Sequence, residues 1–215
     1  MTHDDVRAGV AEACRALAAQ GLVKGTAGNV SVRVGGGIAI TATGAVFADA
    51  TADDVVIVDA DRIVVGGGLA PSTELELHLA AYEDEAVGAV VHTHAPAAVA
   101  LSLVSDRLPC LHYQQLTLGG EIEVVPFAVF GSPELAASTG EALAAANAVI
   151  LAHHGAVTTG RDLADAVTNT ALLEWVCEIY LRARAVCVPA ELGPEQQAAV
   201  VAAALATGYG QKRRV

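Results

Sequence analysis

The sequence predicts an α/β protein in which helices pack against a mixed sheet. Paired strands joined by tight turns come early in the chain, and strand–helix pairs follow later. This order favours a single sheet covered by helices. The 215 residues, 53% of them hydrophobic, are enough to bury a full core. The sequence contains no repeat and no low-complexity linker, so we expect no domain boundary.

The early elements are indicated by their periodicity. Apolar residues at helical spacing predict a helix over Val6–Leu17, which Gly21 ends. Residues 30–34 alternate between valine and polar side chains, as in a half-buried strand, and the glycines at 35–37 turn the chain back into a partner strand. Further strands are expected at Val55–Val58, Ile63–Val65, Ala86–Thr93, Glu121–Val125 and Ala148–Ala152.

The later helices are indicated by their first residues. Thr73 and Glu76 have the spacing of a capping box, which predicts a helix that runs to Tyr82. Pro96 and Pro133 suit the first position of a helix. Four more helices are expected at Pro96–Val104, Pro133–Ala146, Arg161–Val186 and Pro194–Ala206.

Composition excludes several classes of function. The chain has 24 acidic and 12 basic residues, a net charge of −12, so it has no basic face for nucleic acid. No secretion signal opens the chain, which favours a cytoplasmic location. The four cysteines have neither zinc-finger nor redox spacing, and we expect buried, reduced thiols.

Two uncharged stretches have about the length of a membrane span, Ala86–Ser105 and Ala142–Gly160. Glycine or asparagine, histidines and a proline interrupt them. We interpret both as buried strand–turn–helix segments, and we expect no membrane partner.

The histidines are the first candidates for a functional site. His92 and His94 stand two apart at the end of an expected strand, so both side chains leave the same face. A third imidazole from His153 or His154 would complete a three-histidine site with an open position, typical of catalytic zinc. Adjacent residues on a strand face opposite sides, so one of this pair is expected to bind; periodicity does not choose between them.

Three small polar turns are candidates for an anion site. Each alone is an ordinary turn or cap, but together their backbone N–H groups and hydroxyls could hold a phosphate in an acidic protein. Their residues are Gly28, Asn29, Thr43, Gly44, Ser72 and Thr73.

Glu74 follows the last of these turns and is a candidate general base, provided that burial raises its pKa. The only lysines are Lys24 and Lys212, and neither suits Schiff-base chemistry in an apolar pocket. Carbonyl chemistry at a metal ion is therefore the more economical interpretation.

Five short motifs occur in a fixed order: Gly28-Asn29-Val30-Ser31, Thr43-Gly44, Pro71-Ser72-Thr73-Glu74, His92-Thr93-His94 and His154-Gly155. Together they resemble the class II aldolase/adducin family over nearly the whole chain. Length, Tyr113 and Tyr209 match the members that cleave L-fuculose 1-phosphate. Thr73 departs from the usual serine but keeps the hydroxyl.

The resemblance implies one three-layer α/β/α domain over residues 1–215, with a mainly antiparallel central sheet and residues 207–215 as a mobile tail. It also implies a homotetramer with active sites between subunits. The partner is a small phosphorylated sugar rather than nucleic acid or a membrane.

The resemblance also implies roles for the site residues. His92, His94 and His154 would hold Zn²⁺ or another divalent ion, and Glu74 would be the acid/base. Tyr113 would assist proton transfer in a neighbour's site, and Tyr209 would select the aldehyde. The phosphate would contact Gly28, Asn29, Thr43, Gly44, Ser72 and Thr73.

The implied reaction is cleavage of a ketose 1-phosphate, such as L-fuculose 1-phosphate, to dihydroxyacetone phosphate and an aldehyde such as L-lactaldehyde. Alternatives within the family are a 5-deoxyribulose 1-phosphate aldolase, a pentulose-phosphate 4-epimerase, a sugar-acid phosphate decarboxylase and a methylthioribulose-phosphate dehydratase. A non-catalytic adducin-like module is disfavoured because this chain keeps the three histidines and Glu74.

Overall fold

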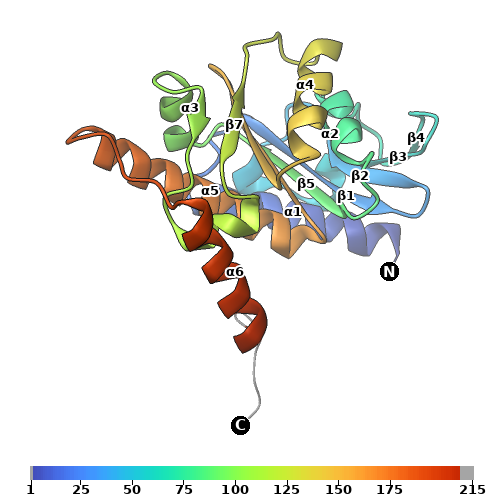
Figure 1. Cartoon of the computed structure of the whole chain (residues 1–215). Coiled ribbons are helices and arrows are strands. Elements are labelled where there is room, and N and C mark those ends of the chain that lie inside the picture. Colours follow the sequence, from blue (N-terminus) through green and yellow to red (C-terminus); the bar gives the residue numbers. More distant parts are fainter. Residues whose placement is uncertain (1, 209–215) are drawn as a thin grey trace.

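The computed structural model describes residues 2–208 (Figure 1). The strands of this range form one nine-stranded sheet in the order β4-β3-β2-β1-β5-β9-β8-β7-β6. Among these strands only β7 and β8 pair in parallel, and the other neighbours are antiparallel. The expected α/β fold with a mainly antiparallel sheet is therefore confirmed.

The strands are β1 (Gly28–Val34), β2 (Gly37–Thr41), β3 (Val55–Val58), β4 (Val64–Gly66), β5 (Ala89–Thr93), β6 (Arg107–Leu108), β7 (Ile122–Val125), β8 (Ala148–Leu151) and β9 (Gly155–Gly160). The α-helices are α1 (His3–Ala19), α2 (Leu75–Ala81), α3 (Pro96–Ser102), α4 (Pro133–Leu143), α5 (Leu163–Arg184) and α6 (Pro194–Thr207). Three 3₁₀ helices are η1 (Phe47–Asp49), η2 (Ala52–Asp54) and η3 (Tyr113–Leu118).

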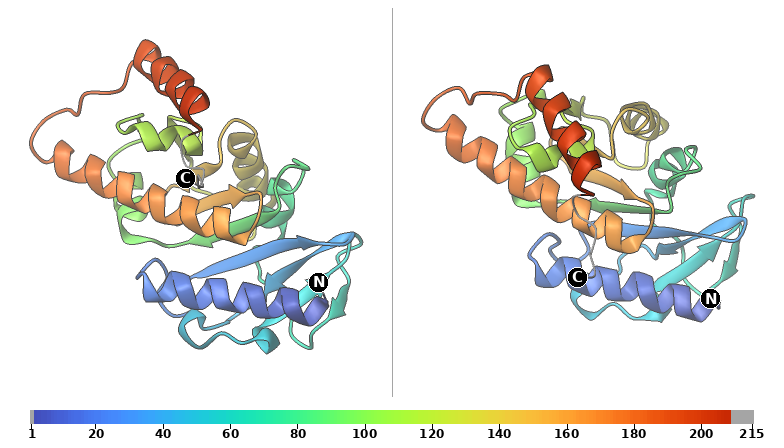
Figure 2. Two further views of the ribbon diagram at one scale, coloured as in Figure 1. Left: turned by 90° about the horizontal axis from the view of Figure 1, so that it is seen from below. Right: turned by 60° about the horizontal axis from the view of Figure 1, so that its bottom comes forward.

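Helices cover both faces of the sheet. On one face α1 and α5 lie side by side and α3 packs against α5 (Figure 2). On the other face α2 packs against α4, while α6 extends away from the body of the molecule (Figure 1). These are the three layers that the resemblance implies.

The central strands β1 and β5 alternate between the two layers. Val30 and Val91 belong to the core beneath α1, whereas Val90 belongs to the core beneath α2 and α4. Because side chains alternate along a strand, His92 faces the α2 layer, as Val90 does. The functional side chains of β1 and β5 therefore emerge on the α2 side of the sheet.

The start of α2 differs from the prediction. The helix begins at Leu75, and Glu74 is the N-cap residue without a side-chain cap hydrogen bond. The predicted capping box between Thr73 and Glu76 is therefore wrong. Glu76 pairs with Arg62 at 2.8 Å instead, because its side chain points to solvent rather than back along the helix.

The stretch after Ala148 also differs. It forms a hairpin, β8–turn–β9, rather than a strand, a turn and a helix. Strand β9 pairs with β8 on one side and β5 on the other, so it is central, and its lack of charge reflects burial. The prediction also omitted the two-residue strand β6 and the 3₁₀ helix η3.

The four cysteines carry free thiols, as expected. Three of them are buried, but Cys187 is exposed, because it follows the end of α5 in a connecting segment. Within residues 2–208, none of the helices has the length and apolar character needed to span a bilayer.

Candidate active site

The ends of β1, β5 and β9 bring three of the site's segments together. His92 lies near the end of β5, opposite Asn29 of β1 on one side and Val157 of β9 on the other. His94 follows the last residue of the same strand. The two histidines therefore leave one edge of the sheet together, as the spacing predicted.

The third histidine comes from the turn of the β8–β9 hairpin. His153 adopts a left-handed conformation with φ of 58°, which an L-residue adopts only where a turn requires it. The turn separates the pair: His154 reaches the β5 histidines, and the exposed His153 faces the ring of Phe127, with centroids 6.3 Å apart. The structure therefore brings His154, not His153, to His92 and His94.

Gly155 lets the hairpin approach β5 this closely. A Cβ atom at this position would lie 2.2 Å from the carbonyl oxygen of Thr93 and 3.0 Å from Cδ2 of His94. Any side chain would therefore push the turn away from the β5 histidines. The glycine after His154 is a geometric requirement of the cluster.

Four side chains form a compact cluster: Glu74, His92, His94 and His154 each offer one ligand atom, and these atoms lie within 4.8 Å of one another. The Nε2 atoms of His92 and His94 are 3.0 Å apart. Glu74 lies between the imidazoles, with Oε2 3.3 Å from Nε2 of His92 and Oε1 3.5 Å from Nε2 of His154. Ligands around one tetrahedral zinc ion have similar separations, about 3.3 Å.

The protonation of the cluster suits a divalent cation. Nδ1 of His92 donates to the backbone oxygen of Ala156 at 3.0 Å, which orients the ring so that its Nε2 faces Glu74 and His94. Burial, with the positive field of His92, lowers the pKa of both His94 and His154 to about 4. These two imidazoles are therefore neutral at pH 7 and can act as ligands.

Glu74 completes the fit. The carboxylate is buried, and within residues 2–208 its Oε1 has no hydrogen-bond partner. Burial alone would raise the pKa of Glu74, but the hydrogen bond and charge of His92, together with the Asn29 amide, lower it far below its usual range. A negative charge beside three inward-facing imidazole nitrogens fits a cation. The predicted rise of the Glu74 pKa is therefore absent in this structure, because the carboxylate contacts His92.

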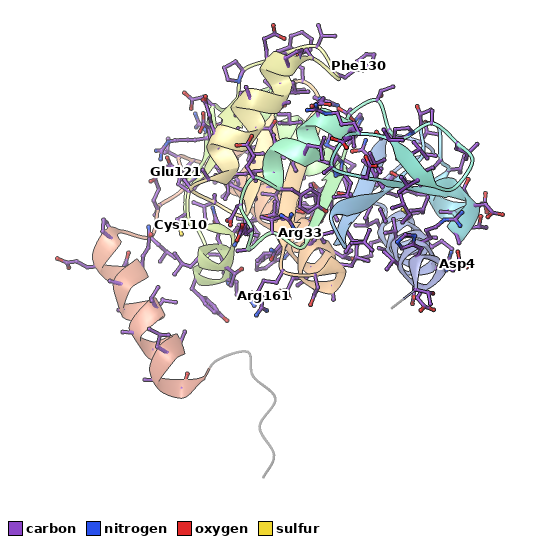
Figure 3. The ribbon with its side chains drawn as sticks, turned by 90° about the vertical axis from the view of Figure 1, so that its right-hand side faces the viewer. Asp4, Arg33, Cys110, Glu121, Phe130 and Arg161 are labelled. Carbon is purple, nitrogen blue, oxygen red and sulfur yellow. The ribbon has the colours of Figure 1, made fainter. Side chains whose placement is uncertain are left out.

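A cavity of about 410 Å³ opens onto this cluster. Its walls include Glu74, His94 and His154, and the loop from Phe127 to Phe130 borders it. Figure 3 shows Phe130 on the loop before α4, at the end of the molecule opposite Arg161. All six residues of the predicted phosphate turns line the same cavity: Gly28, Asn29, Thr43, Gly44, Ser72 and Thr73.

Of the two tyrosines in the sequence prediction, Tyr113 does not line this cavity. Tyr113 lies in η3, its ring stacked on His112 with centroids 4.5 Å apart, and it lines a different cavity beside α6. Tyr209 lies outside the described residues. Sequence reasoning also missed His78, which is fully buried and hydrogen-bonded to Asn29 beneath the cavity. The sequence feature that could have indicated His78 is its position four residues after Glu74, which places both side chains on the same face of a helix.

Comparison with known proteins agrees with this geometry. Residues 8–181 match the family described as class II aldolase and adducin N-terminal domain. A 5-methylthioribulose-1-phosphate/5-deoxyribulose-1-phosphate aldolase of Rhodospirillum rubrum is 37% identical, covering 91% of this chain and 89% of the relative. An L-fuculose phosphate aldolase of Escherichia coli K12 is 34% identical, covering 89% and 90%.

A solved L-fuculose 1-phosphate aldolase superposes with a TM-score of 0.89 at 30% identity, covering 94% of this chain and 97% of that one. Matches of this extent, together with a histidine–carboxylate cluster at the sheet edge, mean that the chain belongs to the class II aldolase/adducin family. Within it, the protein is a metal-dependent sugar-phosphate aldolase, a carbon–carbon lyase.

Proposed function

We propose that the protein cleaves a ketose 1-phosphate to dihydroxyacetone phosphate and an aldehyde, with L-fuculose 1-phosphate as the first candidate substrate. The observation that carries the proposal is the shared cavity. The phosphate turns and the histidine–carboxylate cluster face one space of about 410 Å³, which suits a phosphate at one end and a reacting carbon at the other.

In this proposal His92, His94 and His154 hold one divalent ion, Zn²⁺ by the chemistry of its three imidazole ligands. When bound, the ion supplies Lewis acidity that stabilises negative charge on the substrate oxygens. The chain's own contribution is to fix the three rings. The hydrogen bond from His92 to Ala156 orients one of them, and the tight turn at Gly155 places another.

The substrate phosphate is bound by neutral donors. Asn29, Ser72 and Thr73 line the cavity beside the start of α2, and Thr43 and Gly44 line it from the turn after β2. Backbone N–H groups and hydroxyls bind an anion without lysine or arginine. This accounts for phosphate binding in a chain of net charge −12.

Glu74 is the acid/base in this proposal. In cleavage its Oε1 atom gives a proton to the carbon from which the aldehyde has left, and in condensation it takes that proton from dihydroxyacetone phosphate. Binding of the metal ion would engage Nε2 of His92, which in this structure lies 3.3 Å from Oε2 of Glu74. The carboxylate would then lose this contact.

The assembly we propose is a homotetramer in which Tyr113 acts on the site of a neighbour. Within one chain Tyr113 lines a cavity beside α6, together with Val201 and Leu205, and not the cavity of the histidines. A role at the aldehyde oxygen therefore requires a second copy. We propose that Tyr209 selects the aldehyde at the same interface.

A second candidate substrate is 5-deoxyribulose 1-phosphate or its methylthio analogue. The Rhodospirillum rubrum relative at 37% identity carries that name. The cavity wall is also apolar where Phe127, Val129 and Phe130 border it. An apolar wall accepts a methyl or methylthio group more readily than a hydroxyl-bearing aldehyde.

A substrate panel tests the proposal. Purified, zinc-loaded protein is incubated with L-fuculose 1-phosphate, 5-deoxyribulose 1-phosphate and 5-methylthioribulose 1-phosphate, and dihydroxyacetone phosphate is measured. The ratio of kcat/KM values identifies the preferred aldehyde. Failure of all ketose 1-phosphates to release dihydroxyacetone phosphate would refute the proposed function.

A further inference from the structure

A polar ladder lies between β1 and α2, directly beneath the candidate site. Glu74, His78 and Tyr82 are four residues apart, from the N-cap to the C-cap of α2, and Asn29 and Ser31 are two apart on β1. Four helical residues rise about 6 Å and two strand residues about 6.6 Å. The two spacings match, so the five side chains alternate between helix and strand.

Each step of the ladder is a hydrogen bond. The hydroxyl of Tyr82 lies 2.8 Å from that of Ser31, which lies 2.7 Å from Nδ1 of His78. Nε2 of His78 contacts Oδ1 of Asn29, and Nδ2 of Asn29 donates to Oε2 of Glu74 at 2.9 Å. All five side chains are buried, so water cannot readily replace a lost partner. Loss of one hydrogen bond therefore leaves a buried polar atom unsatisfied, which costs free energy.

The carboxylate fixes the direction of the whole ladder. An ionised carboxylate only accepts, so the Asn29 amide must present Nδ2 to Glu74 and Oδ1 to His78. His78 must then donate from Nε2 and accept at Nδ1, and the Ser31 hydroxyl must donate to that nitrogen. Burial, with the positive field of His92, lowers the pKa of His78 to about 3, so the ring carries a single proton.

We propose that Ser31 and His78 are positioning residues that fix the orientation of the Asn29 amide. With Oδ1 held by His78, the amide can offer only N–H donors to Glu74 and to the cavity that Asn29 lines. A reversed amide would present its oxygen to the substrate anion. This inference rests on the proposed function, because it assigns Asn29 as a donor to that anion.

The ladder also operates when Glu74 moves. When Glu74 turns Oε1 toward the substrate carbon, the contact of Oε2 with Asn29 can break, and the amide would then be able to rotate. The hydrogen bond from His78 keeps Oδ1 in place through this step. Tyr82, at the far end, contributes less to the orientation, because Ser31 can donate to His78 without it.

The first test reads the tautomer of His78 without any turnover. Two-bond ¹H–¹⁵N correlation spectra of the full-length protein, zinc-loaded and chelator-treated, distinguish protonated from bare ring nitrogens. The spectrum of His78→Leu assigns the resonance by its loss. We expect a proton on Nε2 and none on Nδ1. A proton on Nδ1 with bare Nε2 would overturn the inference, whatever the substrate is.

The second test measures the affinity of inorganic phosphate by calorimetry in Ser31→Ala. This variant removes the donor to His78, so the imidazole proton can move and Asn29 is held by Glu74 alone. The amide can then reverse when a bound anion draws the carboxylate away. We expect phosphate to bind about 10- to 100-fold more weakly, the effect of losing a charge-assisted hydrogen bond. The same factor should appear in KM with a smaller change in kcat, and Ser31→Thr should restore most of the affinity.

The matched control is Thr158→Val. It also removes one buried hydroxyl that is hydrogen-bonded to a side chain, that of Thr170 at 2.7 Å, but on the opposite side of the sheet. Its phosphate affinity should stay within about twofold of wild type. Equal weakening in Thr158→Val and Ser31→Ala, or none in Ser31→Ala, would refute the positioning role. If wild type binds no phosphate, the assignment of the phosphate site is wrong. The tautomer of His78 then still tests the proposed direction of the hydrogen bonds in the ladder.

Discussion

Replacement of Glu74 by glutamine separates catalysis from metal binding. The glutamine side chain keeps an oxygen that can accept from Nδ2 of Asn29, so the 2.9 Å contact can persist. The Glu74 side chain makes no cap hydrogen bond to α2, so the helix loses little by the change. Only the charge and the ability to take a proton are removed. We therefore expect Glu74→Gln to fold and to bind its divalent ion.

The structure gives the direction of the effect on the ligands. The Glu74 charge raises the pKa values of His94 and His154, which are nevertheless about 4. Without that charge the two pKa values fall further, so both imidazoles stay neutral at pH 7. Loss of a positioned general base lowers kcat by about 10²- to 10⁴-fold, which corresponds to about 3–5 kcal/mol in the activation barrier.

The assay compares kcat for dihydroxyacetone phosphate release with zinc content per subunit, measured on the same preparations. Glu76→Gln is the matched control, because Glu76 lies on the same helix and pairs with the exposed Arg62 at 2.8 Å, away from the site. It should keep wild-type kcat and zinc content. Turnover of Glu74→Gln within about threefold of wild type would remove Glu74 from the mechanism. Joint loss of zinc and turnover would make it a ligand instead.

The geometry supports three further predictions. Gly155→Ala places a Cβ 2.2 Å from the Thr93 carbonyl oxygen. The free energy of unfolding in urea titrations should therefore fall by about 1–3 kcal/mol, and the affinity for zinc should fall with it. An unchanged urea midpoint would contradict the close approach of the hairpin turn to β5. The pKa of His78 falls from 6.5 to about 3 on folding. The unfolded chain therefore binds the extra proton between these values, and the stability of wild type should decrease as pH falls from about 6.5 to 3, with a shallower slope in His78→Leu; equal slopes would argue against a neutral buried imidazole. Co-expression of Glu74→Gln with Tyr113→Phe should restore about a quarter of wild-type activity to mixed tetramers, because about one site in four then pairs two intact residues; mixtures no more active than either variant alone would place both residues in one subunit.

Much of the fold follows from local pattern. The alternation over residues 30–34 and the glycines after it predict the β1–β2 hairpin, and Pro133 marks the first residue of α4. Strand β9 was missed because Gly155–Gly160 is short and uncharged on both faces. Its identity as a strand depends on its two neighbours, β5 and β8, which periodicity within the segment does not reveal.

Most residues of the candidate site could be predicted from the sequence, but not all of the contacts between them. The spacing of His92 and His94 follows from the strand period, whereas the choice of His154 depends on a left-handed residue in a hairpin turn. The position of Asn29 opposite His92 is a long-range register. Burial of His78 was not evident either, because an isolated histidine on a short helix is more often exposed.

The matched spacing of β1 and α2 limits where the chain can change length. One residue inserted between Glu74 and His78 would rotate the rest of α2 by about 100° and take His78 and Tyr82 off the ladder together. A residue inserted at Gly35 or Gly36 would only lengthen an exposed hairpin, since a Cβ atom at either position meets nothing within 4 Å. Insertions and deletions should therefore be tolerated at the hairpin and rejected in α2, although both segments are short and neither contains a proposed metal ligand.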